Sequence, residues 1–91
     1  MPERTERLKA TLDELRKELD QAEGLDDDER RLLESAVDDL RRRLADERER
    51  EGDYGPVVEQ LEALEGRFQI RHPTLSGLIL RLVDTLGQLG I

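Results

Sequence analysis

Apolar residues in the first part of the chain recur at a helical spacing. They follow one another by alternating steps of four and three residues, at Leu8, Leu12, Leu15, Leu19 and Ala22. At about 100° per residue, these positions cover only about 80° of a helix surface, a stripe as narrow as the seam of a coiled coil. Pro2 suits a first helical turn, and Gly24 suits the position after a helix end. The pattern predicts a helix from about Pro2 to Glu23.

A second helix is predicted to begin at the acidic run of residues 26–29. Asp26 is placed to cap the helix, and Glu29 at the third helical position completes a capping box. The apolar positions of this helix are Leu32, Leu33, Ala36, Val37, Leu40 and Leu44. After Leu44 the sequence ADEREREGDYG contains almost no apolar side chain before Tyr54. This end of the helix therefore either projects into water or frays into a linker.

Two shorter helices are predicted in the rest of the chain. Gly55 and Pro56 mark the start of the third, whose apolar positions are Val57, Leu61, Leu64 and Phe68. It should end near residues 69–71, because His72 precedes a proline and is disfavoured in helical geometry. Pro73 then takes the first turn of a fourth helix that reaches about Leu89.

The fourth helix has the broadest apolar face in the chain, covering about 140° of arc. Its apolar positions are Leu75, Leu78, Ile79, Leu82, Val83, Leu86 and Leu89. A face this broad belongs at the centre of the fold or at a subunit interface. Its candidate interface residues are Leu75, Leu78, Ile79, Leu82 and Leu86.

These elements predict an all-α protein of four helices, arranged as two antiparallel helix hairpins that assemble through helix–helix packing. Residues 1–51 form the longer, charged hairpin and residues 52–91 the shorter, apolar one, as one compact unit or two subdomains. The first two helices would be about 31 Å and 37 Å long. This mismatch makes a single closed bundle awkward, so we expect a homodimer or a higher homo-oligomer.

Charge is distributed unevenly along the chain. Residues 1–51 carry 30 charged side chains and residues 52–91 carry 8, with a net charge of −8 overall. The second half is therefore expected to pack more of its surface against something. The acidic balance and the near absence of aromatic residues argue against nucleic acid as a partner. The run Arg41-Arg42-Arg43 points in three directions among acidic neighbours, which predicts a surface of mixed ion pairs.

Several kinds of chemistry are excluded or unsupported by composition. The chain has no cysteine, which removes disulfides and thiolate sites, and a single histidine, which leaves a metal site without enough ligands. The acidic run 26–29 lacks the central glycine of a calcium loop. We predict no metal and no cofactor.

The N-terminus is charged from its third residue, and the apolar segment 75–91 is too short to span a bilayer. We expect a soluble, cytoplasmic protein with no membrane partner.

The one histidine lies in the segment RHPTLSGL, beside a proline. A general base needs a partner and a substrate pocket, and no Ser, Cys or Asp stands near His72 in a recognisable catalytic spacing. We therefore interpret His72 and Pro73 as the joint between the third and fourth helices. No catalytic residue is predicted, and the protein is expected not to be an enzyme.

The C-terminal segment EGRFQIRHPTLSGLILRLVDTLGQLGI, residues 65–91, resembles the tail of a family of short bacterial proteins known only as a domain of unknown function. The matching features are Phe68, the run His72-Pro73-Thr74-Leu75 and the closing Leu89-Gly90-Ile91. The resemblance implies a small, soluble bacterial helical protein. It implies no activity, ligand or catalytic residue.

The leading functional hypothesis is a structural or protein-interaction module that self-associates and presents a helical surface to another protein. One alternative is a small ligand-binding protein or enzyme with a pocket near His72. Another is an acidic protein that associates with nucleic acid or mimics it.

Overall fold

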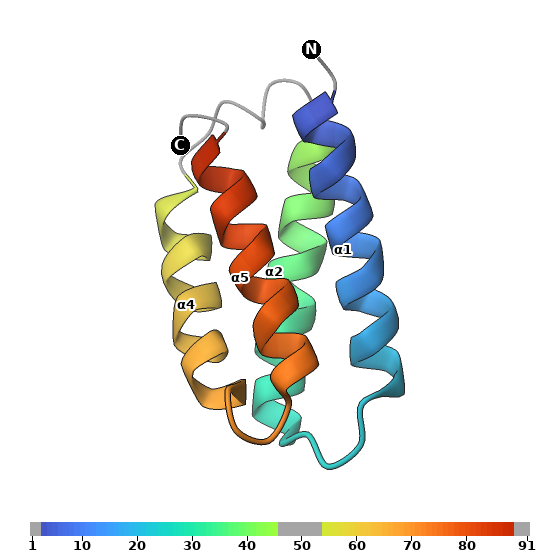
Figure 1. Cartoon of the computed structure of the whole chain (residues 1–91), viewed down its shortest axis with the longest axis vertical. Helices are drawn as coiled ribbons and strands as arrows, with labels where there is room; N and C mark the ends of the chain where they lie inside the picture. Colours follow the sequence, from blue (N-terminus) through green and yellow to red (C-terminus); the bar gives the residue numbers. More distant parts are fainter. Residues whose placement is uncertain (1–2, 46–53, 89–91) are drawn as a thin grey trace.

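The chain folds into four α-helices, drawn in Figure 1 from a computed structural model. The structure describes residues 3–45 and 54–88. The helices are α1 (Glu3–Gln21), α2 (Asp27–Ala45), α4 (Gly55–Phe68) and α5 (Pro73–Gln88), and no strand occurs within the two described ranges. The predicted all-α fold of four packed helices is confirmed.

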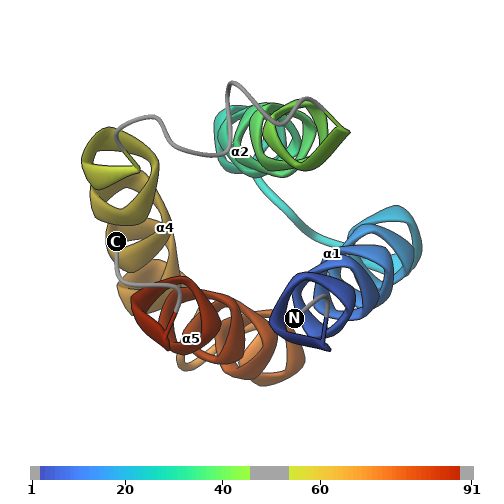
Figure 2. The ribbon, with the colours of Figure 1, turned by 90° about the horizontal axis from the view of Figure 1, so that it is seen from above.

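The helices stand around a common centre, as Figure 2 shows from above. Successive helices run in opposite directions along the long axis of the molecule (Figure 1). α1 packs against α2 and α5, and α4 packs against the same two helices. The first and last helices are therefore neighbours, and one chain supplies all four sides of the bundle.

The lengths of the described helices differ less than the sequence suggested. α1 and α2 each have 19 residues, α4 has 14 and α5 has 16. At 1.5 Å per residue, the longest and shortest differ by only about 8 Å. The predicted extension of the second helix beyond Ala45 and the predicted end of the fourth at Leu89 lie outside the described residues. The expectation that unequal helices would disfavour a single bundle is wrong for the helices as described.

The core is formed by the apolar positions that set the helical periodicity. In α1, the four leucines of the predicted stripe are buried, and Ala22 packs partly against them. All four predicted apolar positions of α4 are buried, and Tyr54 joins them just before the helix. In α2 five of the six apolar positions are buried, whereas Leu32 is 43% exposed. Burial of this continuous apolar cluster is the main force that holds the helices together.

The turn between α1 and α2 depends on two residues. Gly24 has a φ of +77°, in the left-handed region that a glycine adopts without steric cost. Arg30, in the first turn of α2, reaches back and donates hydrogen bonds to the carbonyl oxygens of Leu19 (2.8 Å) and Ala22 (3.0 Å). These carbonyls lie at the C-terminal end of α1, where the helix no longer supplies an N–H donor four residues later. A side chain of one helix therefore completes the end of the other.

Candidate interaction surface

The candidate interface residues of the fourth helix lie inside the bundle. Leu75, Leu78, Ile79, Leu82 and Leu86 are between 0% and 6% exposed, all within the single apolar core. Of the two places that the sequence left open for this apolar face, the structure shows the centre of the fold. The residues of these helices that remain accessible lie on their outer faces.

His72 and Pro73 connect α4 to α5. The backbone N–H of His72 donates to the carbonyl of Phe68 (2.8 Å), and the His72 carbonyl accepts from the N–H of Ser76 (3.0 Å). The imidazole is half-buried and meets the Phe68 ring edge to face, with 5.7 Å between ring centroids. Among the described residues it makes no hydrogen bond to a carboxylate or hydroxyl. His72 thus contacts the core and links the hydrogen-bonding patterns of two helices.

A shallow hollow of about 450 Å³ lies beside His72, at the end of the bundle. Its lining comes from the α1–α2 turn and from the α4–α5 joint: Gly24, Leu25, Asp26, Glu29, Arg67, Arg71 and His72. Arg67 forms an ion pair with Glu29 across it (3.6 Å). In the part of the chain that the structure describes, no three His, Asp or Glu side chains cluster closely enough to hold a metal ion. The hollow brings charged groups together but assembles no acid–base pair around the imidazole.

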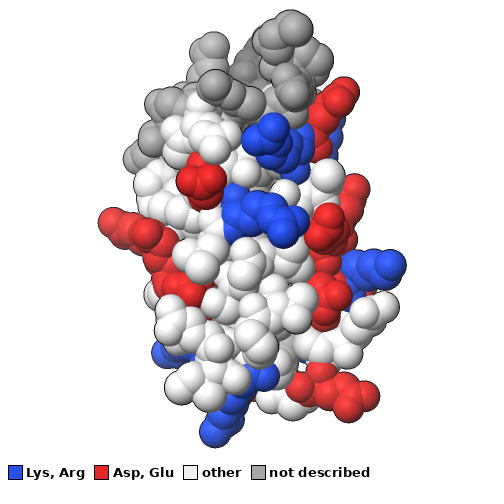
Figure 3. Space-filling view, in the orientation of Figure 1, with Lys and Arg blue, Asp and Glu red and all other residues white. Residues whose placement is uncertain are grey.

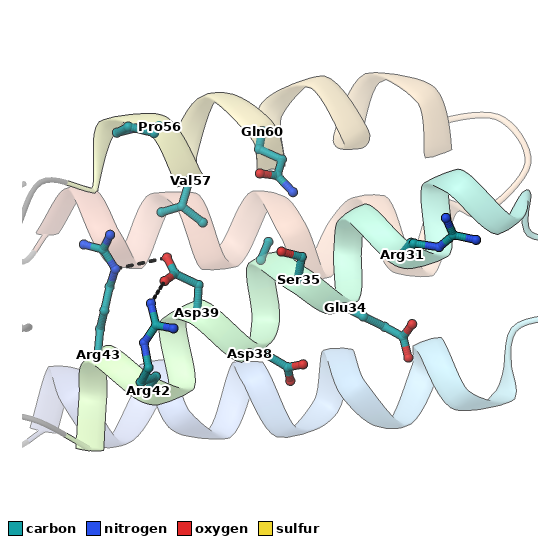
Figure 4. Close-up of a pocket in the computed structure, with 11 residues that line it drawn as sticks. Arg31, Glu34, Ser35, Asp38, Asp39, Arg42, Arg43, Pro56, Val57 and Gln60 are labelled. Atoms are coloured by element: carbon teal, nitrogen blue, oxygen red, sulfur yellow. Dashed lines mark hydrogen bonds and ion pairs between the residues drawn. The ribbon is translucent and has the colours of Figure 1, made fainter.

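A larger hollow of about 780 Å³ lies between α2 and α4 (Figure 4). On the α2 side, the Asp39 carboxylate accepts hydrogen bonds from Arg42 (2.6 Å) and Arg43 (3.0 Å). The Arg43 guanidinium also lies 4.9 Å from the centre of the Tyr54 ring. Arg42 and Arg43 both point toward Asp39, so much of the charge in this hollow is neutralised within the chain.

Ion pairs join the charged faces of α1 and α2. Arg41 reaches Asp13 at 2.7 Å, and Arg16 lies within 4 Å of both Glu34 and Asp38. The arginine run at residues 41–43 therefore forms mixed ion pairs, as predicted. These side chains are substantially exposed, so each pair adds little stability.

α4 presents an exposed ridge on the side turned away from the core. Its residues follow a 4-3-4 spacing, and we call them the α4 ridge: Glu59, Ala63, Gly66 and Ile70. They fall within about 60° of a helix surface. Ile70 is 92% exposed, the largest exposure among the large hydrophobic residues described. Although α4 ends at Phe68, Gln69 keeps helical dihedral angles (φ −52°, ψ −39°), so the ridge continues to Ile70.

α5 presents a second exposed ridge. Its residues follow a 4-3-4-3 spacing, and we call them the α5 ridge: Pro73, Gly77, Leu80, Asp84 and Gly87. Leu80 is 54% exposed and lies between Gly77 and Asp84 along the ridge. Figure 3 shows this face of the molecule, on which the lower part of α5 carries few charged side chains, while charges gather over α1.

The helical glycines of both ridges have no packing partner within the described residues. A Cβ built at Gly66, Gly77 or Gly87 would meet nothing within 4 Å. Glycine inside a helix costs about 1 kcal/mol relative to alanine. Close packing inside the bundle does not explain these three residues, in contrast to Gly24, whose positive φ does explain the choice of glycine.

A polar contact ties α4 to α5 next to these ridges. One carboxylate oxygen of Glu65 accepts hydrogen bonds from the Ser76 hydroxyl (2.7 Å) and the Gln69 side-chain amide (2.9 Å). The Ser76 hydrogen bond, followed by that of Gln69, lowers the pKa of Glu65 below its ordinary value of 4.5. This contact links the two helices that carry the ridges.

The exposed ridges were missed by sequence reasoning, which followed only the buried apolar face of each helix. The available signal was a second periodic set of small residues on the opposite face.

Residues 8–91 match the family model of DUF4404, described as a domain of unknown function. The chain belongs to the DUF4404 family. This confirms the resemblance to a family of unknown function, whereas the proposed pattern of the tail stays a prediction.

Neither the curated proteins nor the solved structures contain a match to this DUF4404 chain. No helix within residues 3–45 and 54–88 combines the length and the apolar content needed to cross a membrane.

Proposed function

We propose that this DUF4404 protein is a structural protein-interaction module that self-associates through an exposed outer ridge, on α4 or on α5. The observation that carries the proposal is the exposure of Ile70 (92%) and Leu80 (54%) on the two helices that bear the fewest charges. Both side chains lie outside the core. Covering them with a partner would remove apolar surface from water, which favours association.

The completeness of the core supports the same proposal. No buried side-chain nitrogen or oxygen among the described residues lacks a hydrogen-bond partner. Thr11 and Thr85 donate to the backbone carbonyls four residues earlier, at 3.0 Å and 2.8 Å. The core of the described residues is therefore complete without the exposed apolar residues, and a contact outside the chain would account for their placement.

Sedimentation velocity over a wide concentration range tests this function. We expect the wild-type protein to shift from monomer to dimer or a higher species as concentration rises. The double variant Ile70→Glu/Leu80→Glu should remain monomeric, with unchanged helicity by circular dichroism. Leu32→Glu is the matched control, because Leu32 is a half-exposed leucine on α2, outside both ridges. A wild-type protein that stays monomeric at millimolar concentration would contradict the proposed function.

A further inference from the structure

The charges around the α4 ridge are sorted along the helix. Glu59 and Glu62 lie toward its start, and Arg67 and Arg71 toward its end. All four are exposed. Glu59, Glu62 and Arg71 form no ion pair with any described residue, and Arg67 makes only the long contact of 3.6 Å to Glu29. The surface beside Ala63 and Gly66 is therefore acidic at one end and basic at the other.

We infer that the α4 ridge binds the same ridge of a second copy of this chain, with the two α4 helices antiparallel about a two-fold axis near residue 65. The inference rests on the proposed function and names the partner and the geometry. In this arrangement the acidic start of one α4 lies alongside the basic end of the other, since Glu59 lies about 9 Å from the axis on one side and Arg71, in the turn that follows Phe68, lies at a similar distance on the other side. Each acidic end then meets a basic end, twice per dimer.

The side chains of the ridge suit such a close contact. Ala63 and Gly66 lie near the axis, and the space at the missing Cβ of Gly66 is open to a neighbouring helix. Small residues let two helix backbones approach closely. Ile70 of each copy would then lie over Ala63 and the aliphatic part of Glu59 in the other copy, which covers the most exposed large apolar side chain described.

The sorted charges favour a second copy over another partner. A partner of uniform charge would be repelled at one end of the ridge, whereas the ridge turned by a two-fold rotation matches itself. The α5 ridge lacks this pattern. Its Asp84 is followed by no basic residue on the ridge, and the neighbouring Arg81 forms an ion pair with Glu14 inside the chain (3.6 Å).

Site-specific cross-linking tests the geometry directly, because the chain has no cysteine of its own. Glu59→Cys and Arg71→Cys are prepared separately and then mixed with a short bis-maleimide. The antiparallel contact predicts a covalent dimer between the two variants. Neither variant alone should cross-link, because like positions lie about 18 Å apart along the axis. Products from each variant alone, without the mixed product, would indicate a parallel contact and overturn the inference.

Charge reversal provides a second test that does not depend on a new covalent bond. Glu59→Arg/Glu62→Arg and Arg67→Glu/Arg71→Glu should each weaken self-association by about 100-fold or more, because like charges meet at both ends. An equimolar mixture should recover a dimer that contains one copy of each. A cooperative urea unfolding transition shows that each variant is folded before denaturant is added.

Leu80→Glu separates failure of this inference from failure of the proposed function. The inference predicts that Leu80→Glu leaves the dimer intact, since Leu80 lies on the α5 ridge. A wild-type dimer that Leu80→Glu breaks and that both charge reversals leave unchanged would overturn the α4 geometry while self-association stands. A strictly monomeric wild-type protein would overturn both.

Discussion

Arg30 Nη1 lies 2.8 Å from the carbonyl oxygen of Leu19, although eleven residues separate the two in the chain. The contact joins the first turn of α2 to the last turn of α1. A positive side chain at a helix C-terminus both donates to the free carbonyls and opposes the negative end of the helix dipole. The hairpin α1–α2 is thus stabilised by a polar contact in addition to its apolar core.

Arg30→Ala should lower the free energy of unfolding by about 1–3 kcal/mol, the range for hydrogen bonds that involve a charged group. In this variant the Ala22 carbonyl loses the arginine donor, and the Leu19 carbonyl keeps only the longer hydrogen bond from the Ala22 N–H (3.3 Å). Urea unfolding followed by circular dichroism measures the change. Arg31→Ala is the matched control, since Arg31 is exposed and its loss should change stability by less than about 0.5 kcal/mol. Equal effects of the two substitutions would contradict the capping role.

Leu82→Ala should destabilise the monomer by about 2–5 kcal/mol, because Leu82 is fully buried and its truncation leaves a cavity. Leu80→Ala, two positions earlier, removes the same atoms from a side chain that is 54% exposed. Its effect on unfolding should stay within about 0.5 kcal/mol. The comparison is made at a concentration where the protein is monomeric. Similar losses for both variants would show that α5 is not oriented as described.

Helical periodicity predicted the buried leucines of α1, the four buried apolar positions of α4 and most of those of α5, where Val83 is only half-buried and Leu89 lies outside the described residues. It did not indicate that Thr11, Ser76 and Thr85 are buried as well. It located the joint at His72 and Pro73, because the steric effect of proline acts on its immediate neighbour. It failed at Leu32, which lies at the edge of the apolar arc of α2. Burial at an edge depends on how closely the neighbouring helix approaches, and a single sequence does not contain that distance.

Helical periodicity could not predict the polar contacts or the exposed ridges, because both depend on how the helices pack against one another. In the sequence, Arg30 is not distinguished from the other charged residues of α2. Its contacts with the end of α1 are seen only in the folded structure. The α4 ridge becomes visible only once Val57, Leu61, Leu64 and Phe68 are known to face the core. The sequence did show that the second half carries few charges, but not which of its residues lie outside the core.

Gly77→Ala and Gly87→Ala should each stabilise the monomer by up to about 1 kcal/mol. A Cβ at either position meets nothing within 4 Å, and alanine reduces the conformational freedom of the unfolded chain. Thermal unfolding at low protein concentration measures the gain. Gly24→Ala is the opposite case: its φ of +77° should make alanine destabilising by about 1 kcal/mol or more. If all three substitutions stabilised the protein, the left-handed turn would be wrong.

The contact between Glu65 and Ser76 should make stability depend on pH in the acidic range. The hydrogen bonds that lower the pKa of Glu65 favour its ionised form in the folded state. Their contribution is therefore present above the ordinary pKa of 4.5 and is lost as the pH falls through the lower value of the folded protein.

Ser76→Ala removes the stronger donor while keeping a small buried side chain. The wild-type protein should be more stable than this variant at neutral pH, and the difference should shrink as the pH falls below about 4.5. Urea unfolding at a series of pH values measures both proteins. A difference that stays constant down to pH 2 would show that the Ser76 hydroxyl does not interact with an ionised Glu65.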